Sequence, residues 1–282
     1  GLRGVAGTSA GGLCALALAL GLPREDRSFV ISTFSDLRSI LRCPDVTLFF
    51  RRYGLEGGEG FRRAIEGMLM RGGLSSSSTL GDLKRLLRID VIFCATDLNS
   101  AKGVRLSADT FPAMRVSDAV YASCCVPFIF SPLAYEDMLL ADGCLVENRP
   151  RCFPPERTLC FDLERPLRKV DDLPGFLESI IHCAVRAQCI DAESRKEPST
   201  RTLVVHLSAD VKSMDFDMQQ HDVEQLVRIG YATSLVAIRG APFLEALFAL
   251  LCFVGRLVRF DHGNCARDDD AIDVDHDTNH CK

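Results

Sequence analysis

The chain has 282 residues, 47% of them hydrophobic, so it can bury a sizeable core and is not globally disordered. Its formal net charge of −5 argues against nucleic acid as a partner, because phosphate binding favours a basic surface. Thirteen cysteines without a C-x-x-C pair and no recognisable signal peptide predict an intracellular, cytoplasmic protein with reduced thiols. The adjacent pair Cys124 and Cys125 is the one place where we expect thiol reactivity.

The first predicted elements are a short strand ending near Thr8 and a helix that follows Ser9. Gly7, Ser9 and Gly11 match the pattern G-x-S-x-G, which is typical of a nucleophilic serine on a sharp strand-to-helix turn. Positions 7 and 11 are expected to require small residues, because larger side chains would clash with the packed strand and helix. The backbone of Ser9 is expected to be strained. The first helical amides, with Ala10 as the candidate donor, would stabilise an oxyanion. The alternative is a glycine-rich helix start with an idle serine.

The rest of the chain alternates between predicted helices and strands. Apolar residues at helical spacing predict helices, and short apolar runs predict strands. Helices are predicted through residue 20 and over 31–41, 61–70, 80–87, 117–122 and 216–238, and strands over 90–96, 104–106, 128–130, 133–135, 138–141, 158–162 and 202–207. Thr79 and Asp82 predict a capping box, and Ser117 is expected to cap the next helix. The alternation indicates an α/β fold with a largely parallel sheet.

A base for the serine is the next requirement, because an unperturbed hydroxyl is a weak nucleophile. Histidine is the usual base, but none of the six histidines lies in a Gly-rich turn or directly after a strand. Asp142 ends the predicted strand 138–141 and precedes Gly143. Since α/β enzymes keep their chemistry at the carboxyl ends of strands, Asp142 is the candidate base. The alternative is a turn residue in an Asp-Gly hairpin.

Taken together, these motifs resemble the patatin-like phospholipase family. The resemblance runs from about Val5 to Pro150 and includes the segments 7–11, 95–99, 117–127 and 141–150. It implies a three-layer α/β/α fold with a mostly parallel sheet, and hydrolysis of acyl esters in phospholipids or related lipids. It also implies a Ser-Asp dyad, in which Ser9 is the nucleophile and Asp142 takes its proton and later activates water.

Two departures from the family pattern qualify this resemblance. Family members carry a glycine-rich oxyanion loop upstream of the elbow, of which Gly1–Gly4 is a faint echo, so we expect the first strand and its loop to be absent from this chain. Cys144 stands where the family usually has a second glycine, which is tolerable if its backbone angles are ordinary. Two alternatives stay open: a catalytically impaired lipid-binding or membrane-docking module, and a Ser-His-Asp carboxylesterase with His206 as the best candidate base.

The C-terminal part is predicted to differ from the rest. We predict a patatin-like α/β hydrolase domain over residues 1–238, an apolar helix over 239–260 and an acidic disordered tail over 261–282. The segment Pro242–Val258 contains Glu245 and Arg256 and is short for a membrane span, so a core helix, an interfacial helix and a span stay open. An interfacial helix would give peripheral membrane association, with the membrane surface as a partner. The family resemblance implies a phospholipid or another acyl lipid as the substrate.

No cofactor and no metal are expected. The run Asp273, Asp275 and Asp277 resembles the start of a calcium loop, but it lacks the glycine at the sixth position. The chain also ends before the twelfth position of such a loop.

Overall fold

The computed structural model describes residues 2–22, 27–35, 46–164, 170–171, 173–194, 203–208 and 220–239. The predicted apolar helix and acidic tail lie outside these residues, apart from Arg239. In chain order the elements are β1 (Gly4–Thr8), α1 (Ala10–Ala19), α3 (Arg27–Ser35), α4 (Val46–Arg52), β2 (Gly54–Glu56), α5 (Glu59–Arg71), α6 (Leu80–Leu87), β3 (Asp90–Asp97), β4 (Lys102–Leu106), α7 (Val116–Cys124), β5 (Phe128–Phe130), β6 (Leu133–Tyr135), β7 (Met138–Asp142), η2 (Gly143–Leu145), η3 (Pro155–Arg157), β8 (Leu159–Glu164), α8 (Leu173–Ser194), β9 (Leu203–Ser208) and α9 (Gln220–Arg239).

The five-stranded sheet is built around β3. β1 pairs with residues 90–94 of β3 in parallel, whereas β4 and β7 pair with residues 93–97 and 95–97 in antiparallel fashion. The α/β class is confirmed, but this sheet is mixed rather than mostly parallel. The reason is that short turns join β3 to β4 and β6 to β7, and such hairpins can only be antiparallel.

The register also fixes the order of strands along β3. A strand has two edges, and β4 occupies one of them along residues 93–97. β1 and β7 therefore follow one another along the other edge, β1 on residues 90–94 and β7 on residues 95–97. The carboxyl ends of these two strands meet in the middle of the sheet.

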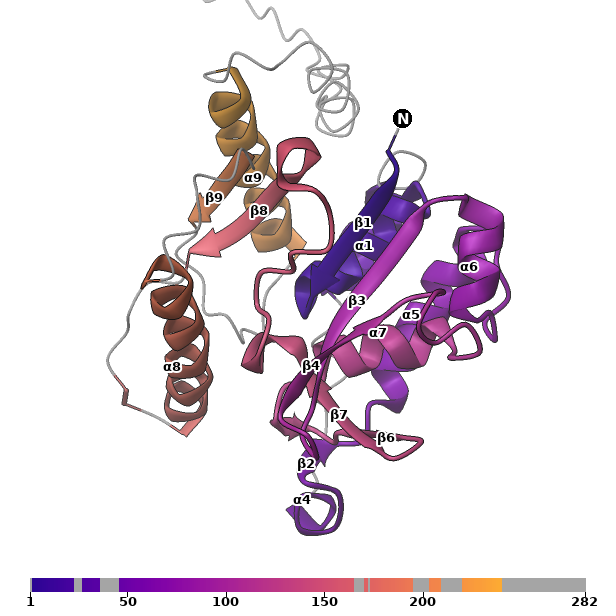
Figure 1. Ribbon diagram of the computed structural model, residues 1–282, viewed down its shortest axis with the longest axis vertical. Helices are drawn as coiled ribbons and strands as arrows, with labels where there is room; N and C mark the ends of the chain where they lie inside the picture. Colours follow the sequence, from indigo (N-terminus) through magenta and orange to yellow (C-terminus); the bar gives the residue numbers. More distant parts are fainter. Residues whose placement is uncertain are drawn as a thin grey trace, which may run out of the picture.

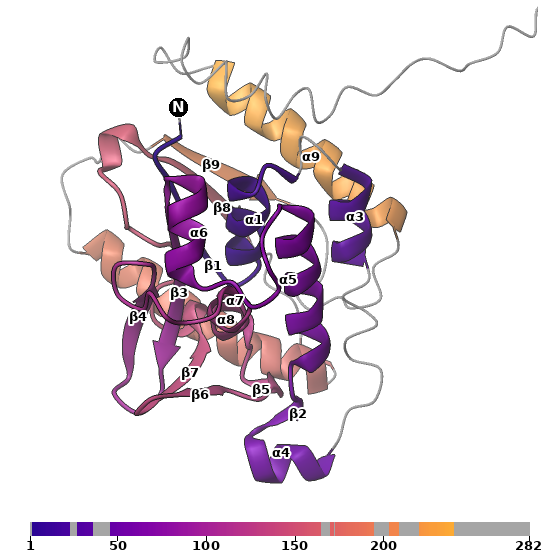
Figure 2. The same cartoon turned by 90° about the vertical axis from the view of Figure 1, so that its right-hand side faces the viewer.

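Helices cover both faces of the sheet. α1, α5, α6 and α7 lie on one side of it, and α8 lies on the opposite side (Figures 1 and 2). The core between sheet and helices contains fully buried side chains such as Leu16, Phe93, Val120 and Leu140. Burial of this apolar surface is the main force that holds α1 and α7 against the sheet.

Helix starts follow the local hydrogen bonds. The predicted capping box is confirmed, since Thr79 Oγ1 accepts from the Asp82 N–H and Asp82 accepts from the Thr79 N–H. The prediction that Ser117 caps α7 is wrong: the cap is Arg115, and Ser117 is buried in the first turn. Arg115 is extended and forms an isolated bridge with Thr79, and the helix begins directly after it at Val116, earlier than a cap at Ser117 would place it.

Two smaller sheets lie beside the main one. β2 pairs with β5, and β8 pairs with β9, both in parallel. β8, β9 and α9 lie together, and α9 also packs against α3. Among the described helices, none combines the length and the apolar character that crossing a bilayer requires.

Candidate active site

Ser9 lies on a strained turn between β1 and α1. Its backbone angles are φ 57° and ψ −133°, which a residue with a side chain rarely adopts. The turn is held by the Ser9 N–H, which donates to the Ser123 carbonyl at 3.0 Å, and by the Gly12 N–H, which donates to the Ser9 carbonyl at 2.7 Å. The predicted strained serine at a strand-to-helix turn is therefore present.

The two glycines of the elbow have different roles. A Cβ atom on Gly7 would lie 2.1 Å from the Gly11 carbonyl oxygen, so the strand can approach the helix only because residue 7 has no side chain. A Cβ atom on Gly11 would meet nothing within 4 Å. The expectation that both positions must be small is thus confirmed for Gly7 and wrong for Gly11, because the helix presents residue 11 to the outside.

Asp142 lies at the junction where β7 meets β1. Thr8 pairs with Cys94 and Asp142 pairs with Ala95, so the residue before Ser9 and the candidate base face consecutive residues of β3. One residue step along a strand is about 3.3 Å. The expected position at the carboxyl edge of a parallel sheet is wrong, because β7 runs antiparallel and ends inside the sheet.

The carboxyl group of Asp142 is buried and held in place. Asp142 has no exposed surface, its Oδ1 accepts from the Cys144 N–H at 2.8 Å, and its carbonyl accepts from Thr96 Oγ1 at 3.0 Å. Gly143 is required next to it, because a Cβ atom there would lie 2.3 Å from the Cys94 carbonyl oxygen and 3.0 Å from Thr8 Cγ2. The turn after Asp142 therefore crosses directly over the end of β1.

Residues 123–125 connect the two candidate residues. The Ser123 carbonyl accepts from the Ser9 N–H, and the Ser123 hydroxyl donates to the Cys94 carbonyl at 2.7 Å. The Cys124 thiol donates to the Ser9 carbonyl at 3.0 Å, and the Cys125 carbonyl accepts from the Asp142 N–H at 3.0 Å. The end of α7 thus contacts both the elbow and the end of β7.

The two adjacent cysteines are donors rather than nucleophiles. Burial, and after it the negative charge of Asp142, raises the pKa of Cys124 well above its ordinary value. Burial and Asp142 also raise the pKa of Cys125. Because the thiolate is the reactive form, the reactivity expected for this pair is not supported.

The turn after Asp142 is clamped by α8. Gln188 Nε2 donates to the Cys144 carbonyl at 2.7 Å, and Gln188 Oε1 accepts from the Asn148 N–H at 3.0 Å. Cys144 itself lies in the 3-10 turn η2 and is absent from the positive-φ residues of the described chain, so a cysteine fits where the family has glycine. Sequence reasoning missed Gln188, because it comes from a helix that was not predicted.

The histidines within the described residues lie on other elements. His206 lies in β9 and pairs with Asp162 of β8, whereas Ser9 follows β1 of the five-stranded sheet. His182 lies in α8. Within the described ranges, no three His, Cys, Asp or Glu side chains gather in an arrangement that would hold a metal ion.

Comparison with known proteins finds a family model and solved structures that this chain resembles. A family model described as patatin-like phospholipase matches residues 2–151. The crystal structure of VipD from Legionella pneumophila is similar with a TM-score of 0.45 and 15% sequence identity. That match covers 84% of this chain and 61% of the VipD chain, so the chain spans about three-fifths of VipD. No curated protein matches the chain.

Proposed function

Because the chain belongs to the patatin-like phospholipase family, we propose that it hydrolyses the acyl esters of phospholipids with Ser9 as nucleophile and Asp142 as base. The observation that carries this proposal is the junction of β1 and β7, where Thr8 and Asp142 face consecutive residues of β3. Ser9 follows Thr8 on a strained turn and the buried Asp142 ends β7, so both candidate residues belong to this junction.

The first half of the proposed reaction forms an acyl-enzyme. Ser9 Oγ attacks the acyl carbonyl carbon, and Asp142 takes the hydroxyl proton. The tetrahedral intermediate collapses with cleavage of the bond between the carbonyl carbon and the alkoxy oxygen. Asp142 returns the proton to that oxygen, and the lysolipid alcohol leaves.

The second half regenerates the enzyme. Asp142 takes a proton from water, and the water oxygen attacks the carbonyl carbon of the acyl-serine. Collapse of this intermediate breaks the bond to Ser9 Oγ, which takes the proton back from Asp142. The products are a free fatty acid and the original serine.

The amino end of α1 is the proposed source of oxyanion stabilisation. Ala10 is the first helical residue and is exposed. The first N–H groups of a helix have no partner inside the helix, and the helix dipole favours negative charge at that end. The Ala10 N–H is therefore the proposed donor to the oxyanion.

The two alternatives make different predictions. A Ser-His-Asp carboxylesterase needs a specific histidine, and His206 lies in a separate sheet from the elbow. A catalytically impaired lipid-binding module would keep the fold and bind lipid without turnover. An interfacial helix, one of the three alternatives for residues 242–258, would serve either function, and this segment lies outside the described residues.

Ester hydrolysis by the full-length protein tests the proposal. Ser9→Ala is expected to abolish hydrolysis of both a water-soluble short-chain ester and phosphatidylcholine vesicles, while His182→Ala and His206→Ala retain most of it. Loss of activity in His206→Ala to the level of Ser9→Ala would favour the carboxylesterase. Wild-type protein that binds lipid and hydrolyses neither substrate would favour the impaired module.

A crystal structure supplies an independent test of the dyad. Ser9 Oγ and the Asp142 carboxylate are expected within hydrogen-bond distance of each other or one water apart. A separation beyond about 6 Å, twice a hydrogen-bond length, would contradict the dyad.

A further inference from the structure

The region around α4 exposes aromatic side chains to an unusual degree. Phe50 is 78% exposed and Tyr53 is 65% exposed, the two highest values among the large hydrophobic residues of the described chain. Phe49 packs edge-on against Phe50 and lies 6.4 Å from the ring of Phe128, measured between centroids. Phe128 is itself 37% exposed, and the Tyr53 N–H donates to the Phe49 carbonyl at 2.9 Å, so the four aromatic residues belong to one region of the surface.

The backbone holds two of these rings outward at the cost of strain. Tyr53 has φ 64° and Phe128 has φ 71°, a region in which bulky residues are outliers. Gly54 follows Tyr53 and pairs with Phe128, and a Cβ atom on Gly54 would lie 2.2 Å from the Ser131 N atom, so β2 packs closely against β5. Strain that keeps aromatic rings out of the core points to a function for those rings outside it.

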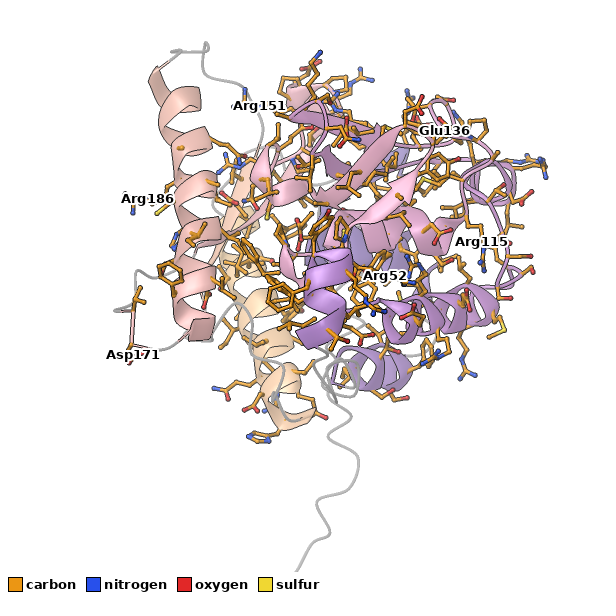
Figure 3. The ribbon with its side chains drawn as sticks, turned by 90° about the horizontal axis from the view of Figure 1, so that it is seen from below. Arg52, Arg115, Glu136, Arg151, Asp171 and Arg186 are labelled. Carbon is orange, nitrogen blue, oxygen red and sulfur yellow. The ribbon has the colours of Figure 1, made fainter. Side chains whose placement is uncertain are left out.

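Two cations complete the surface. Arg51 and Arg52 form the last turn of α4, both are exposed, and the first turn of that helix carries no acidic residue. Figure 3 views the protein from the end at which α4 lies and shows Arg52 beside that helix. Figure 2 shows the same helix projecting beyond the sheet and its helices.

The surface is also connected to the catalytic junction. Phe128 follows Cys124 by four residues, and the Cys124 thiol contacts the Ser9 carbonyl. Four residues span at most about 14 Å. A lipid surface that contacts Phe128 would therefore lie within one acyl-chain length of the elbow.

We infer that Phe49, Phe50, Tyr53 and Phe128 with Arg51 and Arg52 form a docking surface for a bilayer that contains anionic phospholipids. The aromatic rings enter the boundary between headgroups and acyl chains, where amphipathic and aromatic side chains bind favourably. The two guanidinium groups pair with lipid phosphates, because arginine binds phosphate through a planar fork of donors. This inference rests on the proposed function, since it explains how an insoluble substrate reaches Ser9.

Vesicle co-sedimentation of the full-length protein tests this surface, with vesicles of phosphatidylcholine alone and with one-third phosphatidylglycerol. Wild type is expected to bind the anionic vesicles more tightly. R51Q/R52Q should weaken that binding about 25-fold, since each arginine near an anionic surface contributes about fivefold. Phe50→Ser with Tyr53→Asn should weaken binding to both vesicle types by about tenfold or more; asparagine tolerates the positive φ at residue 53.

Matched controls lie on α8. Phe176 is 51% exposed, and Arg186 is exposed on the same helix (Figure 3), so the double variant Phe176→Ser with Arg186→Gln removes one ring and one charge away from α4. This variant should bind vesicles as the wild type does. If it weakens binding as much as the α4 variants do, or if the α4 variants bind normally, the docking surface is not at α4.

A second readout separates docking from catalysis. Hydrolysis of the water-soluble short-chain ester should be unchanged in the α4 variants, while hydrolysis of anionic vesicles falls with binding. If wild type hydrolyses neither substrate but α4 variants still lose vesicle binding, the proposed function fails and the docking surface stands. Thermal unfolding of each variant checks its folding, and the arginine variants keep the test valid if the aromatic ones fail to fold.

Discussion

Two turns of the sheet, one after β3 and one after β7, each begin with a buried aspartate. Asp97 is 6% exposed and Asp142 is 0% exposed. The Asp97 carboxylate accepts from the N–H groups of Asn99, Ser100 and Leu139 and from the Ser100 hydroxyl. The Asp142 carboxylate accepts from the Cys144 N–H, and the backbone of Asp142 faces Ala95, one residue along β3 from the partner of Thr8.

The difference shows that burial and residue type do not identify a base. The Ser100 hydroxyl, with the N–H groups of Asn99 and Leu139, holds the pKa of Asp97 below its usual value. A carboxylate stabilised in this way resists protonation and serves to fasten the 97–100 turn to β7. Asp142 is the candidate base because of where its strand ends, and not because of its sequence neighbours alone.

The largest expected effect comes from exchanging each aspartate for asparagine. Asp142→Asn should lower kcat for the short-chain ester by about 100- to 10,000-fold, because the amide cannot accept the proton of Ser9. Asp97→Asn should leave kcat per folded molecule within a few fold and lower the Tm instead. Equal losses of kcat in the two variants would remove the distinction between the two turns.

Replacing a glycine with alanine at each of the two turns should show that the turn after β7 is packed more tightly than the turn after β3. Gly143→Ala places a Cβ atom 2.3 Å from the Cys94 carbonyl oxygen, and such overpacking is expected to lower the free energy of unfolding by about 3 kcal/mol or more. In Gly103→Ala, after the β3 turn, the new Cβ atom would lie 3.4 Å from its nearest neighbour, Val146 Cγ1. This substitution should change the free energy of unfolding by less than about 0.5 kcal/mol. Urea unfolding measures both, and a stable Gly143→Ala protein would contradict the close crossing of the turn after β7 over the end of β1.

Removal of the clamp on the β7 turn should have a smaller effect on activity. Gln188→Ala deletes the donor to the Cys144 carbonyl and the acceptor for the Asn148 N–H, and we expect kcat to fall about tenfold with KM unchanged, since small displacements of catalytic groups are costly. Arg186→Ala on the same helix is the control. A lower Tm with unchanged kcat would reduce Gln188 to a packing role.

The smallest expected effect is the pH dependence of stability from the β3 turn. Since the folded pKa of Asp97 is lowered, its contribution is present above the unfolded pKa of about 3.9 and is lost as the pH falls through the folded pKa. The Tm difference between wild type and Asp97→Asn should therefore shrink between pH 5 and pH 3. A difference that is constant over this range would contradict the assigned cause.

Much of the site could be predicted from sequence because its signals are local. The spacing of Gly7, Ser9 and Gly11 identifies a strand-to-helix turn, and an apolar strand followed by Asp-Gly identifies Asp142. The requirement for a glycine at position 11 was wrong, because the clash arises at Gly7 and depends on how closely the strand approaches the helix. Such an approach is a tertiary distance that sequence spacing does not contain.

The rest depends on pairing and on distant contacts. The direction of β7 follows from its hairpin with β6, and the register that brings Asp142 beside Thr8 involves residues more than 130 positions apart. Ser123 lies in the segment 117–127 that resembles the family, but its contact with the Ser9 N–H is visible only in the fold. α4 and α8 were not predicted, so neither the docking surface nor the Gln188 clamp could be anticipated.

The most direct test of the account is covalent labelling of the full-length protein with a fluorophosphonate, followed by peptide mass spectrometry. We expect one adduct, on Ser9, that forms at least 100-fold more slowly in Asp142→Asn and at the wild-type rate in Asp97→Asn and His206→Ala. An adduct on another serine, or labelling of Ser9 at an unchanged rate in Asp142→Asn, would contradict a nucleophile activated by Asp142.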